Sequence, residues 1–240
     1  MMNTSIERFL CLLLTITLSA CAAATVADET QTAPATSSRP SQIVIYPFAA
    51  NPAEITLNQG IVQRTYRNMS GTDQTAEQQK LATDTASNLC LSVASNLTAK
   101  GYRAVCLKRG EPVADNNALI VDGEFTDISE GNRLRRLVIG FGTGASTLDT
   151  NVHVYQRTDS GSQQLIDFNT HADSGKMPGA AIMGPAGAAA GGSAAVVVGA
   201  NAAMGGAKSY TSATGYLADK TATQITDTVT QYYTQHGWAP

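Results

Sequence analysis

Gln42-Ile43-Val44-Ile45-Tyr46-Pro47-Phe48 is a β-branched and aromatic run with a proline near its end. Such residues favour a pleated, buried surface, and proline is rarely tolerated inside a sheet, so we expect a short buried strand. A helical pattern follows between Thr72 and Lys100, and a second apolar run, Tyr102 to Leu107, comes after it. A strand, a helix and a strand in this order predict a right-handed parallel crossover in an α/β fold.

The expected helix has one apolar stripe, in which residues recur three and four positions apart. The stripe consists of Ala82, Ala86, Leu89, Cys90, Val93, Ala94 and Leu97. Gly101 is the expected stop, because helices commonly end at a glycine. This arrangement places Cys90 on the buried face of the helix, one layer from Cys106 on the next strand. In an oxidising compartment the two cysteines would form a disulfide worth about 3 kcal/mol, and two buried reduced thiols are the alternative.

Further along the chain, apolar and polar residues alternate, which predicts half-buried strands that form an antiparallel meander. These strands are expected at Ala118–Ile128, Arg133–Ile139, Thr147–Gln156 and Gln164–His171. A last amphipathic helix is expected from Thr211 to His236, ending at Gly237. The predicted fold is therefore one mixed sheet of about five strands, with two main helices packed on it and a Gly/Ala-rich helical segment in addition.

Two segments near the start of the expected domain have no periodic pattern. Residues 22–40 are rich in Ala, Thr, Ser, Asp and Glu and include two prolines, so they bury almost nothing and are expected to form a flexible tether. Residues 49–71 are expected to be a long loop, with a short extended piece at Ile61 to Tyr66. A loop of this length is uncommon in a compact domain and often carries function.

The N-terminus has the features of an exported protein. Arg8 precedes an apolar run, Phe9 to Leu18, which is too short to cross a bilayer as a helix because about 20 residues are needed. Leu18-Ser19-Ala20-Cys21 resembles the lipobox of bacterial lipoproteins, and this resemblance implies that Cys21 is lipidated and becomes the first mature residue. Ala22, rather than an aspartate, implies sorting to the outer membrane with the body in the periplasm. An ordinary secretory peptide that leaves Cys21 free is the alternative.

These boundaries divide the chain into a signal peptide at residues 1–20, a lipidated cysteine and tether at 21–40, and one α/β domain at 41–240. The chain has 240 residues, a net charge of -3 and only 15% charged residues. Such a composition has neither the basic surface of a nucleic-acid-binding protein nor a polybasic face for anionic lipid. We therefore expect attachment to the membrane through the lipid anchor, and no nucleic-acid partner.

The segment at residues 177–207 carries no charge and is dominated by glycine and alanine. Its length exceeds what a spanning helix needs, but it has few strongly apolar residues and glycine disfavours helices. Gly187 and Gly191 are four positions apart, a spacing that lets two backbones approach closely. We expect an Ala/Gly helix from Pro185 to Ala203, or two pieces broken near Gly191-Gly192, that packs on this domain or on another copy; membrane insertion is the alternative.

No pattern in the chain predicts catalysis, a metal or a cofactor. Gly140 to Gly144 is rich in glycine, but a strand rather than a helix is expected to follow it, which argues against a phosphate-binding loop. The three histidines are scattered, so no zinc site is expected. His171, Asp173 and Ser174 could form a triad, although a solvated turn explains them better. We expect a protein that is not an enzyme.

The only basic cluster consists of Arg133, Arg135 and Arg136. It could bind a carboxylate or a phosphate, or contact a partner. Solvated charges at a strand edge are the alternative explanation.

The segment Gly131 to Leu148 resembles a signature of an uncharacterised family of bacterial lipoproteins that carry a domain of unknown function. The matching features are Gly131-Asn132, an arginine, Gly140-Phe141-Gly142, a further glycine and Ser146-Thr147-Leu148, leading into a strand. The resemblance extends from Ile43 to the last helix. More distantly, the order of elements is similar to periplasmic lipoprotein domains of the curli-secretion-channel and penicillin-binding-protein-activator type.

The sequence thus predicts a lipid-anchored outer-membrane protein that faces the periplasm and acts as a non-enzymatic envelope binding or scaffolding module. Its expected partner is an envelope protein or a second copy of the chain. An oligomeric channel or export subunit that uses residues 177–207 is the alternative function. A hydrolase of envelope material is a third possibility, which the lack of a catalytic constellation disfavours.

Overall fold

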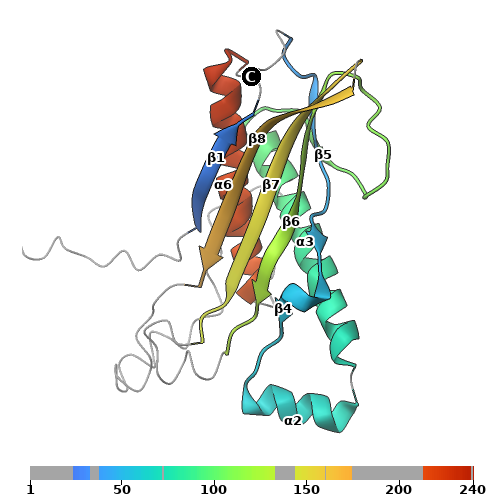
Figure 1. The fold of residues 1–240 in the computed structure, drawn as a ribbon, viewed down its shortest axis with the longest axis vertical. Helices are drawn as coiled ribbons and strands as arrows, with labels where there is room; N and C mark the ends of the chain where they lie inside the picture. Colours follow the sequence, from blue (N-terminus) through green and yellow to red (C-terminus); the bar gives the residue numbers. More distant parts are fainter. Residues whose placement is uncertain are drawn as a thin grey trace, which may run out of the picture.

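The structure is a computed structural model of the chain, and it describes residues 24–32, 38–71, 73–132, 144–159, 161–174, 213–238 and 240. Within these residues, one open mixed sheet of eight strands forms the body of the molecule (Figure 1). The strands are β1 (Ala24–Gln31), β2 (Gln42–Ile45), β3 (Ala49–Ala50), β4 (Ile55–Thr56), β5 (Ala104–Cys106), β6 (Ala118–Ser129), β7 (Thr147–Thr158) and β8 (Gly161–Asp173).

The order across the sheet is β1-β8-β7-β6-β2-β5, and the short strands β3 and β4 pair with β6. Strands β6, β7 and β8 form an antiparallel meander at three of the four expected strand positions, whereas β2 is parallel to both β5 and β6. The fourth expected strand, Arg133–Ile139, lies outside the described residues. The predicted strand, helix and strand are therefore present, with β2 and β5 as parallel neighbours.

Two long helices, α3 (Gln74–Ala99) and α6 (Ala213–Gln235), cover one face of the sheet (Figure 1). The Asp73 side chain caps α3 by accepting the N–H of Thr75 at 2.9 Å. Just after the helix, Gly101 has a φ of +89°, a conformation that favours glycine. The predicted stripe of α3 is buried against the sheet, and Leu89, Val93 and Leu97 are fully inaccessible to solvent.

The strand register joins distant parts of the chain in one row. Ala24 of β1 pairs with Ala172, Ala172 with Leu148, Leu148 with Ile128, and Ile128 with Ile55 of β4. The beginning of β1 therefore lies at the same end of the sheet as β4.

The sheet has eight strands, more than the five or so that we expected. One reason is that part of the segment expected to be a flexible tether forms a strand. Ala24–Gln31, expected to be flexible, is an edge strand antiparallel to β8. Ala24 and Val26 are half-buried and pack on the core, and the free backbone edge of β8 supplies the hydrogen bonds. Tertiary pairing therefore overrides a composition that buries little.

The prediction of a long loop at residues 49–71 was also wrong. It contains β3, a 3₁₀ turn at Pro52–Glu54, β4 and a ten-residue helix, α2 (Ile61–Ser70). The piece expected to be extended, Ile61 to Tyr66, is thus helical. None of the helices in the described part of the chain combines the length and the apolar character needed to cross a bilayer.

Candidate functional site

Several segments of the chain meet at the end of the sheet where β4 lies, which we call the α2 end. The row from Ala24 to Ile55 brings the start of β1 there. Asp173, at the end of β8, pairs with Thr147 at the start of β7, so the chain that follows β8 leaves from this end too. Figure 1 shows α2 below β4 and the end of β6.

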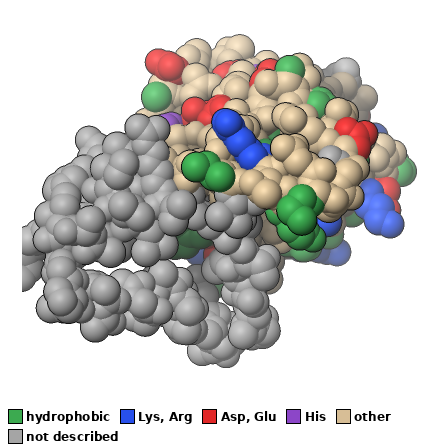
Figure 2. Space-filling view, turned by 90° about the horizontal axis from the view of Figure 1, so that it is seen from below, with side chains coloured by type: hydrophobic (Ala, Val, Ile, Leu, Met, Phe, Trp, Pro, Cys, Tyr) green, Lys and Arg blue, Asp and Glu red, His purple; other side chains and the backbone are tan. Residues whose placement is uncertain are grey.

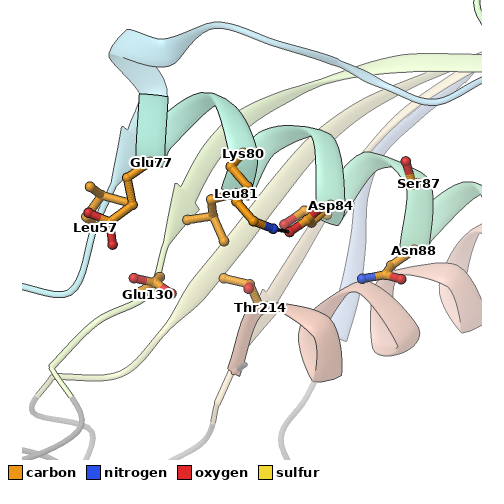
Figure 3. Close-up of a pocket in the computed structure, with 10 residues that line it drawn as sticks. Leu57, Glu77, Lys80, Leu81, Asp84, Ser87, Asn88, Glu130 and Thr214 are labelled. Atoms are coloured by element: carbon orange, nitrogen blue, oxygen red, sulfur yellow. Dashed lines mark hydrogen bonds and ion pairs between the residues drawn. The ribbon is translucent and has the colours of Figure 1, made fainter. Parts of the chain in front are cut away.

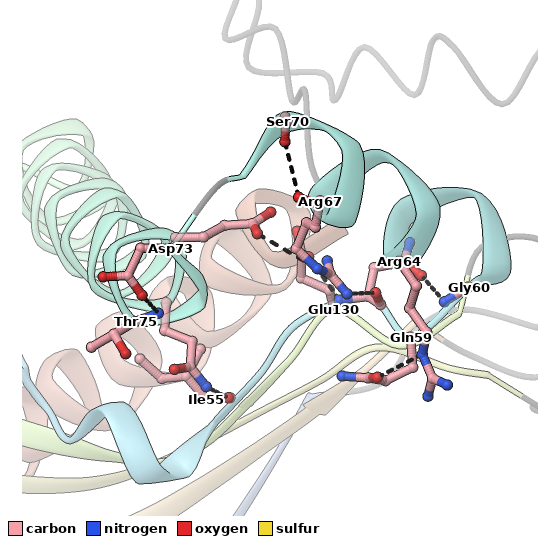
Figure 4. Close-up of polar contacts among 12 residues, drawn as sticks. Ile55, Gln59, Gly60, Arg64, Arg67, Ser70, Asp73, Thr75 and Glu130 are labelled. Atoms are coloured by element: carbon pink, nitrogen blue, oxygen red, sulfur yellow. Dashed lines mark hydrogen bonds and ion pairs between the residues drawn. The ribbon is translucent and has the colours of Figure 1, made fainter.

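The polar side of α2 is fixed to the body of the protein (Figure 4). Arg67, whose side chain is only 13% exposed, donates from Nη2 to the backbone oxygen of Asn58 at 2.8 Å. Its Nε lies 3.8 Å from Oε2 of Glu77 on α3. The N–H of Asn58 in turn donates to Oε2 of Glu130, just after β6, at 3.0 Å. The segment that leads into α2 is therefore tied to both the sheet and α3.

The apolar side of α2 faces away from the body. Ile61, Tyr66 and Met69 are 78%, 71% and 83% exposed. Seen from below, hydrophobic and basic side chains lie next to each other on the described surface (Figure 2). An amphipathic helix on a globular protein normally buries its apolar stripe, whereas α2 leaves these three residues of its stripe exposed.

A groove with a volume of about 410 Å³ lies beside α2, between the N-terminal half of α3, the end of β6 and the start of α6 (Figure 3). Its lining residues are Leu57, Glu77, Lys80, Leu81, Asp84, Thr85, Ser87, Asn88, Glu130 and Thr214. Lys80 and Asp84 form an exposed i,i+4 ion pair within it. The groove thus combines charges of both signs with two leucines, a surface suited to binding a polar partner.

The sheet face opposite α3 and α6 is polar. Nδ1 of His153 lies 2.7 Å from Oδ2 of Asp167, and Asp122 occupies the neighbouring position of the same row on β6. His171 pairs with Asp149, which lies four residues before His153 on β7. Among the described residues, no group of three or more His, Cys, Asp or Glu side chains is arranged to hold a metal ion.

The residues considered for a triad are not arranged as one. Nε2 of His171 lies 3.8 Å from Oδ2 of Asp173, while Nδ1 of His171 is taken by Asp149. Ser174 Oγ accepts the N–H of Ser146 at 3.0 Å, and within the described chain no hydrogen bond joins it to His171. These contacts fix the ends of β7 and β8 to each other.

Cys90 and Cys106 are bonded in the structure, with Cα atoms 5.6 Å apart. Cys90 is buried on α3 and Cys106 half-buried on β5, as the stripe predicted. Cys21, the arginine cluster at 133, 135 and 136, and the segment at residues 177–207 lie outside the described residues. The expectations for them remain predictions.

Sequence reasoning missed the apolar face of α2. A signal was present, because Ile61, Tyr66 and Met69 fall on one side of a helix with 3.6 residues per turn. The pattern covers only ten residues and alternates with arginines, so it does not resemble a core helix.

Four titratable groups have clearly shifted pKa values, and burial is the main cause that raises the pKa of Tyr155 and of Tyr232. Burial raises the pKa of Tyr233, which is only 1% exposed on α6. Hydrogen bonds from Ser41, and then from the N–H of Asn117, lower the pKa of Asp115. None of these four groups lines the groove.

The chain belongs to the family described as Domain of unknown function (DUF4410), whose sequence model matches residues 43–191. This confirms the resemblance to an uncharacterised family. No curated protein matches the chain. Among solved structures it is similar to a PelC dodecamer from Paraburkholderia phytofirmans, at 11% identity and a TM-score of 0.33, covering 67% of this chain and 89% of that one. A leucine-to-methionine variant of the same PelC gives 12% identity, a TM-score of 0.33 and coverage of 67% and 88%.

Proposed function

We propose that this chain is a lipid-anchored outer-membrane protein whose body lies in the periplasm and acts as a non-enzymatic binding or scaffolding module. The anchor is Cys21, in Leu18-Ser19-Ala20-Cys21. The working surface is the groove at the α2 end, where an envelope partner binds. The distant resemblance to curli-secretion-channel and penicillin-binding-protein-activator type domains agrees with such a role.

The observation that carries the proposal is that the start of β1 and the groove lie at one end of the sheet. Ala24 shares a row with Ile55, and Gln78, one residue from the groove-lining Glu77, donates to the Ile55 oxygen at 2.7 Å. A lipid on Cys21 therefore holds the groove near the membrane surface, because only two residues separate Cys21 from β1. A partner that is itself in the membrane can reach it there.

Fractionation and mass spectrometry test the anchor. We expect wild-type protein in the outer membrane, with an acylated Cys21 peptide, and Cys21→Ala protein released or retained as an unlipidated precursor. Wild-type protein that is soluble in the periplasm, without an acyl mass on its N-terminal peptide, would overturn the proposal.

Site-specific photo-cross-linking in intact cells tests the groove. A photoreactive residue at Lys80, which is 75% exposed, should give a discrete adduct with an envelope protein. The same residue at Ser95, an exposed position on α3 about 22 Å along the helix, is the matched control. Equal adduct patterns from both positions would show that the groove is not the binding surface.

The alternative function is an oligomeric channel or export subunit that uses residues 177–207. Ser174 and Thr214 flank that segment, and both lie at the α2 end, where Ser174 bonds Ser146 and Thr214 lines the groove. This alternative predicts that the protein causes liposomes to release their contents and that Gly187→Leu abolishes this release. The scaffold proposal predicts no leak from either protein.

A further inference from the structure

The helix α2 is held by its polar side and presents its apolar side to the outside. Arg67 fixes the helix through Asn58 and Glu77, while Ile61, Tyr66 and Met69 remain mostly exposed. Leaving three large apolar side chains in water costs free energy that burial would recover, at about 25 cal/mol per Å² of apolar surface. The exposed apolar stripe of α2 therefore indicates that another surface covers this face.

The short segment between Cys21 and β1 indicates which surface covers this face of α2. Cys21 precedes Ala24 by three residues, which span at most about 10 Å. Ala24 and Ile55 are four strand steps apart in one row, about 19 Å across the sheet. Because α2 begins six residues after Ile55, an anchor at Cys21 and the apolar face of α2 border the same end of the domain.

We propose that α2 lies in the interface of the bilayer and inserts Ile61, Tyr66 and Met69 among the lipid headgroups. This inference rests on the proposed lipid anchor at Cys21 and names the second membrane contact of the domain. The two contacts together fix the orientation of the groove relative to the membrane.

The composition of α2 fits a lipid surface. Its ten residues include two arginines and no acidic residue, and Arg64 is exposed. Helices of this kind lie in the membrane plane with the apolar face buried about 5–10 Å deep. The apolar contact of α2 adds to the binding that the acylated Cys21 supplies.

A second copy of the chain fits this face less well. Ten helical residues are about 15 Å long, and one face of such a helix is small beside the roughly 1,200–2,000 Å² that a stable protein interface buries. A lipid surface needs no matching partner surface.

Lipid-borne quenching tests the inference on the full-length acylated protein. Ile61→Cys and Met69→Cys are labelled with an environment-sensitive fluorophore and reconstituted into vesicles of phosphatidylethanolamine and phosphatidylglycerol. A quencher attached to the lipid headgroup should reduce the emission several-fold more at 61 and 69 than at Leu91→Cys. Leu91 is the matched control because it is 56% exposed on α3. Circular dichroism of each variant verifies that the fold is retained.

Flotation of the same samples separates the two proposals. Protein that floats with the vesicles but is quenched equally at 61, 69 and 91 overturns the contact by α2 and leaves the anchor standing. If the protein does not float with the vesicles, the proposed lipid anchor is overturned, and so is the proposed membrane contact by α2. Labels at 61 and 69 that are shielded from water without lipid quenching also overturn the inference. Energy transfer between copies would then identify a second copy as the occupant, and shielding in a detergent-solubilised monomer would identify the chain itself.

Discussion

Ala24 and Ile55 lie in one row of the sheet, joined through three intervening strands. The chain therefore returns to the end of the sheet where it entered before it forms α2. A lipid on Cys21 would hold the domain by two residues instead of a long tether, and it would keep the groove close to the bilayer.

Arg67→Ala should loosen α2 without unfolding the domain. The substitution removes the hydrogen bond to the Asn58 oxygen and the ion pair with Glu77, and hydrogen bonds to charged groups contribute about 1.5–3 kcal/mol. Because Arg67 ties α2 to both Asn58 and Glu77, we expect amide exchange in residues 61–70 to accelerate by about tenfold or more, with little change elsewhere.

Arg64→Ala is the matched control. Arg64 is exposed, and its Nε donates to the side-chain oxygen of Gln59 at 3.1 Å. Its removal should leave the exchange of α2 nearly unchanged. Equal effects of the two substitutions would show that Arg67 has no special role in holding the helix.

Reduction of the bond between Cys90 and Cys106 should destabilise the domain. The two residues are 16 apart in the sequence, and a loop of this size corresponds to about 3 kcal/mol in the chain-entropy model. Urea unfolding with and without a reductant measures the difference, and a Cys90→Ala/Cys106→Ala protein should be insensitive to the reductant. Peptide mapping of protein taken from cells gives the native state, and two freely alkylated thiols would contradict the prediction.

A flexible insertion between Ala22 and Ala23 should separate the two proposed membrane contacts, the lipid on Cys21 and the helix α2. A Gly/Ser linker of about ten residues has a root-mean-square span of about 17–19 Å, so the domain can leave the surface. The effective concentration of α2 at the bilayer then falls, and quenching of a label at Met69 should decrease while flotation persists. Unchanged quenching would show that α2 binds lipid without help from a short anchor.

The sequence predicted the elements whose own side chains define them. The stripe that includes Leu89 and Val93 identified α3, and the alternation around Val152 and Val154 identified β7. Their burial needs no knowledge of the partner element, because the period alone shows which face is apolar.

The remaining elements depend on contacts that the sequence does not show. Strand β1 forms because the edge of β8 offers hydrogen bonds. Its own residues, such as Asp28 and Glu29, are typical of a flexible tether and do not predict a strand. The two-residue strands β3 and β4 exist only through pairing with β6. The helix α2 contacts the body through Arg67 on its polar side, so a search for a core-facing stripe misses it. The groove forms where α3, the end of β6 and the start of α6 meet.

Tyr233→Phe should stabilise the domain, most strongly at alkaline pH. The ring is buried and contacts Tyr102 edge-on at 5.0 Å, and the hydroxyl has no hydrogen-bond partner in the described part of the chain. Removing an unpaired buried hydroxyl should raise the free energy of unfolding by about 1 kcal/mol. Burial also raises the pKa of Tyr233 above the value of about 10 expected in the unfolded chain.

The raised pKa fixes the sign of the pH effect. Below about pH 10 both states keep the phenolic proton, whereas above it the unfolded state loses the proton first and gains stability. Wild-type stability should therefore fall above pH 10, and the phenylalanine variant should fall less steeply in urea unfolding measured across this range. Tyr46→Phe is the control with the opposite sign at neutral pH, because the Tyr46 hydroxyl donates to the Glu111 oxygen at 2.7 Å. A Tyr233→Phe protein that is less stable than wild type at pH 7 and equally sensitive to alkali would show that the hydroxyl is satisfied in solution.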